Sequence, residues 1–486
     1  MSSAIEGLEP QLLWKHFAAL SRIPRGSKNE AAISKYVYET AGKLGLTAKQ
    51  DPLGNVVVIK PASPGKQNVR PICLQGHLDM VCEKNADKAH DFMKDPIELV
   101  RKGDAITANG TTLGADNGGA VATNLAIMED KTLEHGPLEL LFTIDEETGL
   151  TGASNLEKGF LKSRTLINLD SEDEGELYVG CAGGMDTLGT WKAAFEAAPE
   201  GSVAMKLNVS GLRGGHSGID IDKGRGNAIK IANRVVLALA KSAGTRLSAI
   251  NGGNKRNAIP RECEAVLFIP QNKLEKAKKI VAKFNDTVRI EFATVEKDLS
   301  IALTEMPAAP NARVLKKALQ KKLCRTIAAL PHGVIKMSAE ISWLVETSTN
   351  VAVITTKEDS ISLATSQRSS VASEIEEIAQ TASAVFALGG AKVENSDGYP
   401  GWKPNLDSPI LKLAARTYQS LFGKEPAVKA VHAGLECGII GERIPGMDMV
   451  SFGPTLKDVH TPDEKILIDT VGKFWKFLLA LLKNAN

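Results

Sequence analysis

The sequence has no paired cysteines and no long apolar run. Its six cysteines are scattered without a C-x-x-C pair, which is not the pattern of a disulfide framework or of a cysteine-rich structural zinc module. No run of about 18 apolar residues occurs, so a membrane-spanning helix is not expected. The first residues also lack the basic and apolar regions of a secretory signal. Together these absences favour a cytoplasmic protein with free thiols.

A strong net charge is missing as well. The chain carries 59 Lys and Arg against 57 Asp and Glu, a formal net charge of +2. This balance gives no electrostatic reason to expect a nucleic acid or an anionic membrane as a partner. The lysine cluster at residues 316–322 is interpreted as a solvated helix face.

The chain is long, and two patterns divide it. Its 486 residues exceed what one compact core accommodates, so more than one domain is expected. Apolar strands alternate with helical segments near both ends, which is typical of an α/β sheet covered on both faces. Between the glycine-rich stretches at 180–186 and 396–405, apolar and polar residues alternate along the predicted strands, as in an antiparallel sheet with one face exposed to solvent. The sequence predicts a mixed, mainly parallel catalytic domain (1–185 and 400–486) flanked by helices, with an inserted α+β lid domain (186–399).

Histidine or carboxylate side chains follow each of four predicted buried strands. Open α/β sheets place their sites at the carboxyl ends of strands, where loops converge. One such histidine, read alone, is more often a surface or core residue, but four strands with the same ending form a constellation. The residues are His77 and Asp79 after 71–76, Asp145, Glu146 and Glu147 after 138–144, Asp170 at the end of 165–170, and His460 after 448–453.

A further carboxylate, Asp116, lies in the glycine-rich turn 110–119 before a predicted helix at 118–129. Alone it reads as a helix cap, but beside the strand-end residues it is better interpreted as a metal ligand, with glycines that let the backbone approach an ion. Two histidines and three carboxylates without cysteine suit zinc, cobalt or manganese in a catalytic site. They exceed the needs of one zinc ion and fit two metals about 3.5–4 Å apart that share a bridging carboxylate.

The motifs that contain these residues resemble a known family. GHLDMV, GADNG, DEETG, LDSEDEGE, GGHSG, NAIPRE, HAGLECG and VHTPDE occur in the order seen in the aminoacyl-histidine dipeptidase branch of the di-zinc metallopeptidases. That family also includes carnosinases, aminoacylases and glutamate carboxypeptidases. The resemblance extends from near the N-terminus to near the C-terminus, and GTTLGADNG, GCAGG and HAGLECG are the details that narrow it to this branch.

The resemblance implies a role for each residue of the strand-end constellation. Glu146 matches the general base, and Asp79 matches a carboxylate that orients His77, which we expect to be its only contact. Without the family match, nothing in the sequence separates Glu146 from Glu147 as base and ligand. The implied metal ligands are His77, Asp170 and the bridging Asp116 for one ion, and Glu147, His460 and the same Asp116 for the other.

The resemblance also implies substrate contacts. His216, in a glycine-rich turn of the inserted segment, would stabilise the oxyanion of the tetrahedral intermediate. Asn257 and Arg368 would hold the substrate carboxylate, a task that suits a guanidinium because it forms paired hydrogen bonds. Glu436 would line the substrate pocket near the metals.

The implied activity is metal-dependent hydrolysis of Xaa-His and other dipeptides, with a metal-bridging hydroxide as nucleophile and Glu146 as general base. Two divalent ions are expected, zinc first and cobalt or manganese as alternatives. An N-acyl-amino-acid deacylase or a carboxypeptidase could use the same centre. A phosphoesterase would need a phosphate clamp that is not visible, and an inactive binding protein would be expected to lack a ligand or the base. The sequence is compatible with a homodimer but does not specify one.

Overall fold

The computed structural model describes residues 3–485, and its chain falls into two compact units. The predicted boundaries, after residues 185 and 399, stay predictions; the units themselves divide at nearby positions. The first unit contains Met1–Cys181, Trp402–Ala430 and Leu435–Asn486, and the second contains Ala182–Gly401 and Val431–Gly434.

The first unit is built on an eight-stranded sheet whose four central strands are parallel. β3 and β6 are buried along their whole length, which explains why their sequences are continuous apolar runs rather than alternating ones. The strands on either side of this centre, β2 and β8, pair antiparallel. The predicted mixed, mainly parallel α/β class is therefore confirmed. The strand order is β1 (Thr47–Gln50), β2 (Val56–Lys60), β6 (Leu138–Thr143), β3 (Ile72–His77), β7 (Thr165–Asn168), β23 (Asp448–Ser451), β8 (Glu176–Cys181) and β22 (Ala427–Val431).

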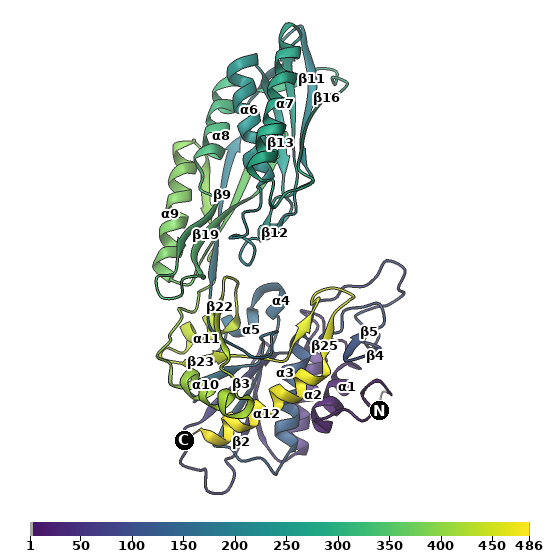
Figure 1. The fold of residues 1–486 in the computed structure, drawn as a ribbon, viewed down its shortest axis with the longest axis vertical. Helices are drawn as coiled ribbons and strands as arrows, with labels where there is room; N and C mark the ends of the chain where they lie inside the picture. Colours follow the sequence, from purple (N-terminus) through teal and green to yellow (C-terminus); the bar gives the residue numbers. More distant parts are fainter. Residues whose placement is uncertain (1–2, 486) are drawn as a thin grey trace. The chain divides into compact units, whose positions relative to one another are not determined.

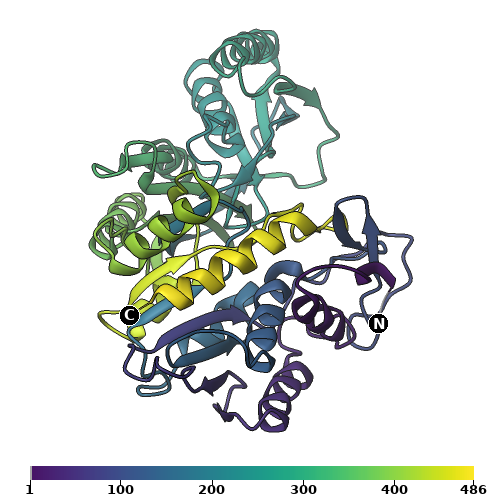
Figure 2. The ribbon, with the colours of Figure 1, turned by 60° about the horizontal axis from the view of Figure 1, so that its bottom comes forward.

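Helices surround this sheet, and α3 (Ala115–Glu129) is buried on nearly every side. It begins three residues before the predicted start, because Asp116 and Asn117 lie inside it with non-helical backbone angles. Figure 2 shows the long C-terminal helix α12 (Ile468–Asn484, yellow) lying across the first unit. The other helices of this unit are α1 (Gln11–Leu20), α2 (Ala31–Lys43), α4 (Glu146–Gly149), α5 (Thr151–Ser154), α10 (Pro409–Phe422) and α11 (Glu436–Arg443).

A small antiparallel sheet accompanies the main one in the first unit. Its order is β24 (Leu456–Lys457), β25 (Lys465–Leu467), β5 (Ala105–Ala108) and β4 (Leu99–Lys102). The loop between β24 and β25 contains His460, so this sheet fixes both ends of that loop.

The second unit is an antiparallel sheet with four helices on one face (Figure 1). Its strands and helices share one apolar core, to which Leu207, Val235, Val281, Leu323 and Phe386 contribute. This confirms the period-two pattern read from the sequence. The strands are β16 (Ser300–Glu305), β11 (Ser202–Ser210), β15 (Cys263–Pro270), β13 (Arg246–Gly252), β19 (Val345–Thr356), β20 (Ser360–Ser369), β9 (Gly183–Lys192) and β21 (Lys392–Asn395), with β18 (Gly333–Met337) beside β19; the helices are α6 (Ala228–Ala243), α7 (Leu274–Glu291), α8 (Lys317–Ala329) and α9 (Ala372–Leu388).

A separate two-residue pairing in the second unit joins β12 (Gly215–His216) to β14 (Ala258–Ile259). It places His216 opposite Ala258, next to Asn257. Among residues 3–485, no helix is both long and apolar enough to cross a bilayer.

Candidate metal centre

Three of the five predicted ligands lie at the carboxyl ends of parallel strands of the first unit. His77 is the last residue of β3, Glu147 lies in α4 just after β6, and Asp170 lies just after β7. Asp116 is in the irregular first turn of α3, and His460 is in the loop between β24 and β25. The structure thus brings together all five predicted ligands from five separate segments of chain.

The five side chains form two groups that share Asp116. His77 Nε2 lies 3.1 Å from Asp116 Oδ1 and 3.4 Å from Asp170 Oδ1. His460 Nε2 lies 3.1 Å from Asp116 Oδ2 and 3.1 Å from Glu147 Oε1. Each group offers three ligand atoms within 4.8 Å of one another. Because Asp116 turns a different oxygen to each group, it has the geometry of a bridging carboxylate.

Electrostatics make this cluster a strong attractor of positive charge. Burial lowers the pKa of His77, but the Asp170, Asp116 and Asp79 carboxylates outweigh it and hold that pKa well above its ordinary value. Hydrogen bonds to Asp116 and Glu147 raise the pKa of His460 to about 11. Burial raises the pKa of Asp170 to about 6. His77 opposes this shift, and the charges of Asp116 and Glu147 add to it. Protons are thus drawn to the atoms where cations would sit.

The residues fit divalent cations. Asp170 Oδ1 is buried without a hydrogen-bond partner among the described residues, although it faces His77 Nε2. Buried carboxylates need compensating charge, which divalent ions between the two histidines and Asp116, Glu147 and Asp170 would supply. A set of imidazole and carboxylate donors without thiolate suits zinc, cobalt or manganese.

The geometry distinguishes the two neighbouring glutamates of DEETG. Glu147 contacts His460, whereas Glu146 is grouped with His77 and Glu147. Burial raises the pKa of Glu146 well above its ordinary value. His77 opposes this shift, and the charges of Asp170, Glu436 and Glu147 add to it. A carboxyl with a raised pKa is a better proton acceptor than an ordinary exposed one.

Asp79 has more contacts than its sequence suggested. Its Oδ1 lies 3.3 Å from His77 Nδ1, without a well-aligned hydrogen bond. The same carboxylate accepts hydrogen bonds from Glu146 N at 3.0 Å, Glu147 N at 3.2 Å and Ser27 Oγ at 2.8 Å. The prediction that Asp79 contacts only His77 is therefore wrong. Asp79 also fixes the main chain of the turn that contains both glutamates.

Glu436, at the start of α11, is fully buried. Its Oε2 accepts hydrogen bonds from Gln75 Nε2 at 2.5 Å and Thr143 Oγ1 at 2.7 Å, and Asn168 Nδ2 donates to Gln75 Oε1 at 2.6 Å. Burial raises the pKa of Glu436 to about 7. These side chains form a row across β6, β3 and β7, close to the strand ends that supply ligands. The role of Glu436 in substrate binding stays a prediction.

His216, in the second unit, is held in one tautomer. Its Nδ1 accepts hydrogen bonds from the main-chain N–H groups of Gly218 and Ile219, both at 3.2 Å. The ring proton of the neutral imidazole therefore lies on Nε2. Burial, and secondly the charge of Arg368, lower the pKa of His216 to about 4. The ring is consequently neutral, with an N–H available to donate.

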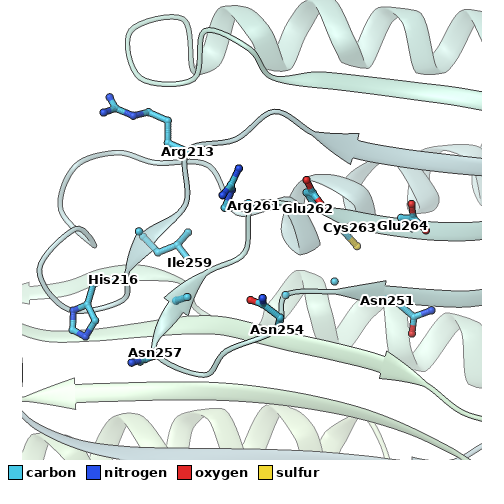
Figure 3. A pocket seen from close by; sticks show the side chains of 14 residues that line it. Arg213, His216, Asn251, Asn254, Asn257, Ile259, Arg261, Glu262, Cys263 and Glu264 are labelled. Carbon is cyan, nitrogen blue, oxygen red and sulfur yellow. The ribbon is translucent and has the colours of Figure 1, made fainter. Parts of the chain in front are cut away.

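His216 and Asn257 line the same pocket of the second unit, which has a volume of about 760 Å³ (Figure 3). Ser217 N donates to Asn257 O at 2.8 Å, so the two loops are fixed to each other. Arg368 is buried on β20 and its Nη2 lies 3.5 Å from His216 Nε2. The structure therefore brings together the three substrate-binding residues predicted in the inserted segment.

Sequence reasoning missed residues that hold these side chains in place. In the second unit, Arg368 Nη1 donates to Tyr399 Oη at 2.8 Å. In the first, Arg25 and Glu464 contact the turn before Asp116. Of these, only Glu464 had a usable signal, because it lies four residues after His460 in VHTPDE.

A parallel α/β unit with two histidine–carboxylate groups at its strand ends, joined to an antiparallel second unit, defines a class of metallopeptidases. The chain belongs to peptidase family M20/M25/M40, whose family model matches residues 73–484. The predicted family is thereby confirmed.

Two of the relatives that match nearly the whole chain are more than 40% identical to it. The cytosol non-specific dipeptidase of Escherichia coli (strain K12) is 41% identical over 481 residues, 99% of each protein. The crystal structure of aminoacylhistidine dipeptidase from Vibrio alginolyticus has a TM-score of 0.90 at 43% identity, covering 100% of this chain and 98% of that one. A tripeptidase from Staphylococcus aureus, 18% identical with a TM-score of 0.57 over 98% of both chains, shares the fold alone.

Proposed function

We propose that the chain is a metal-dependent dipeptidase of the cytoplasm that hydrolyses Xaa-His and other dipeptides. The observation that carries this proposal is the pair of three-ligand groups sharing Asp116. The activities and the compartment in the names of the two full-length relatives support it. A homodimer is part of the proposal, and sedimentation velocity of the purified chain tests it.

In this proposal His77, Asp116 and Asp170 hold one divalent ion, and Asp116, Glu147 and His460 hold the other, with zinc as the native metal and cobalt or manganese as alternatives. Bound divalent ions polarise a carbonyl group and lower the pKa of water to about 7. Asp79 lies beside His77 Nδ1 and leaves Nε2 to face the ligand atoms of Asp116 and Asp170.

Glu146 is proposed as the group that moves the proton. Its carboxylate takes a proton from the attacking water and delivers it to the nitrogen of the departing amino acid. Asp79 accepts a hydrogen bond from the main-chain N–H of Glu146, which limits the movement of that residue. Precise placement matters here because proton transfer requires hydrogen-bond distance.

The second unit supplies donors for the substrate. His216 Nε2–H and Arg368 Nη2–H are both donors, so their 3.5 Å contact is not a hydrogen bond between them; residues 3–485 offer this pair no acceptor. A carbonyl oxygen that gains negative charge, or a carboxylate, is the acceptor that such a pair suits. We propose His216 for the oxyanion, Arg368 and Asn257 for the substrate carboxylate, and Glu436 as a residue near the bound dipeptide.

A hydrolysis panel tests the proposal. Purified protein is assayed with Xaa-His dipeptides, other dipeptides, tripeptides and N-acetyl amino acids, before and after dialysis against a chelator. We expect turnover of dipeptides, loss after chelation, and recovery when Zn²⁺, Co²⁺ or Mn²⁺ is added. Preference for N-acetyl amino acids would instead indicate the deacylase alternative, and activity that survives chelation would contradict the metal-dependent mechanism.

A further inference from the structure

Two buried groups of opposite charge hold the turn that contains Asp116. The Arg25 side chain is 3% exposed and that of Glu464 is 2% exposed, both in the first unit. Neither side chain belongs to the two groups of proposed metal ligands. Buried charges are costly unless they are well paired, so their contacts need an explanation.

Glu464 accepts four main-chain hydrogen bonds from consecutive residues. Leu113 N and Gly114 N donate to its Oε2 at 2.8 and 3.0 Å, and Ala115 N and Asp116 N donate to its Oε1 at 2.7 and 3.3 Å. Glu464 belongs to the loop between β24 and β25, four residues after His460. Its carboxylate therefore joins the His460 loop to the Asp116 turn, which together supply two of the three ligands of one group.

Arg25 holds the same turn from the other side. Its Nη1 donates to the carbonyl oxygens of Leu78 and Asp79 at 2.9 and 3.0 Å, and its Nη2 donates to the carbonyl oxygen of Gly114. Leu78 and Asp79 directly follow His77. The guanidinium therefore joins the His77 strand end to the Asp116 turn, which supply two of the three ligands of the other group.

Two glycines of this turn, Gly114 and Gly118, lie against Arg25. A Cβ atom at Gly114 would lie 2.6 Å from Arg25 Nη2, and one at Gly118 would lie 2.7 Å from it. Gly114 also has a φ of +68°, which disfavours other residues. Gly114 and Gly118 therefore make room for the guanidinium, and the interpretation that the glycines of this turn let the backbone approach a metal stays a prediction.

We infer that Arg25 and Glu464 are positioning residues, each acting mainly on one ion. Arg25 fixes the group of His77, Asp116 and Asp170, and Glu464 fixes the group of Asp116, Glu147 and His460. The inference rests on the proposed function, because it takes the two groups to be metal sites. Ligands fixed before the ion arrives bind it more tightly, since less order is lost on binding.

The test measures ion binding rather than activity. In Glu464→Gln, the amide nitrogen faces two main-chain N–H groups, so donor meets donor and part of the contact is lost. The matched control is Glu139→Gln: Glu139 is also buried and accepts main-chain hydrogen bonds from Lys162 at 2.9 Å and Ser163 at 2.8 Å, away from the ligands. Arg25→Lys keeps the positive charge but loses the forked geometry.

Metal-free protein is titrated with Co²⁺, and its visible absorption reports each ion. The two ions are assigned with Asp170→Asn and Glu147→Gln, each of which removes a ligand from one group only. We expect Glu464→Gln to weaken the ion of the Glu147 group by about 10–100-fold, the usual effect of losing a residue that orients ligands. Arg25→Lys should weaken chiefly the ion of the Asp170 group, and Glu139→Gln should weaken neither.

Thermal unfolding of each metal-free variant, recorded in parallel, separates ion binding from loss of the fold. If Glu464→Gln does not fold, Glu464→Asp, whose shorter carboxylate reaches fewer of the four N–H groups, must show the same selective loss. Equal weakening of both ions by both variants, or no weakening, overturns the inference. Wild-type protein that binds fewer than two ions would instead overturn the proposed function.

Discussion

The two units hold their candidate functional side chains in opposite ways. In the first unit, His77 is 1% exposed, and His77 and His460 lie 3.1–3.4 Å from the carboxylates of the other proposed ligands, in turns fixed by further buried charges. In the second, His216 belongs to a two-residue strand and Asn257 is exposed at an open pocket (Figure 3). The first unit is thus organised to concentrate negative charge, and the second leaves donors that lack an acceptor. Substitutions should separate these two contributions.

The largest effect is expected for Glu146→Gln in the first unit. The amide cannot take a proton from water, so kcat should fall by about 10²–10⁴-fold. Because Glu147 and the four other proposed ligands are untouched, the metal content measured by atomic emission should stay at the wild-type value. Full turnover by this variant would remove Glu146 from the role of base, and loss of metal would make it a ligand instead.

A smaller effect on kcat is expected for His216→Ala in the second unit. Loss of the Nε2–H donor should lower kcat by about 10²–10³-fold, the usual cost of one missing oxyanion donor. Both ions should remain bound with wild-type affinity, since no proposed ligand lies in the second unit. If the Co²⁺ titration of this variant shows weaker ion binding, the proposal that the first unit binds the metals and the second unit only donates hydrogen bonds to the substrate is wrong.

The smallest effect concerns stability in acid. Burial, and secondly the charge of Arg368, lower the pKa of His432 to about 3, and its Nε2 lies 2.7 Å from Ser348 Oγ. Between pH 6.5, the ordinary value for histidine, and that lower value, the unfolded chain binds a proton that the folded chain does not. The free energy of unfolding must therefore fall as the pH falls through this range, by at most about 1.4 kcal/mol per pH unit from this group.

His432→Gln isolates this contribution. Glutamine can still accept a hydrogen bond from Ser348 but takes up no proton, so its free energy of unfolding should decline less steeply with acid than that of the wild type. Urea unfolding at several pH values from about 7 to about 4.5 measures both slopes. Identical slopes would show that His432 is protonated in the folded protein, contrary to its burial.

The proposed ligands could be picked out from the sequence because most of them have a local signature. His77, Glu147 and Asp170 follow apolar runs that predict buried strands, and the parallel sheet then brings the ends of those strands together. Asp116 and Glu146 were assigned by their motifs, and the structure separates Glu146 from Glu147 through the contact of Glu147 with His460.

The supporting contacts could not be predicted in the same way. Arg25 bonds to main-chain oxygens more than 50 residues away, and Glu464 to main-chain N–H groups about 350 residues away. Every residue has such groups, so nothing in the sequence marks the partner. Two of the additional contacts of Asp79 could not be predicted for the same reason, since they too are made with main-chain N–H groups; the third is made with Ser27 Oγ.

The position of β23 has a consequence for the order in which the protein is completed on the ribosome. This strand comes from residues 448–451, yet it lies between β7 and β8, which are synthesised long before it. Until it emerges, both neighbours expose unpaired strand edges. The second unit is made almost entirely of residues 182–401, so nearly all of its strands and helices are synthesised before β23. The first unit is therefore the first to be synthesised and the last to complete its sheet. A nascent chain stalled before residue 448 should contain a folded second unit and an incomplete main sheet.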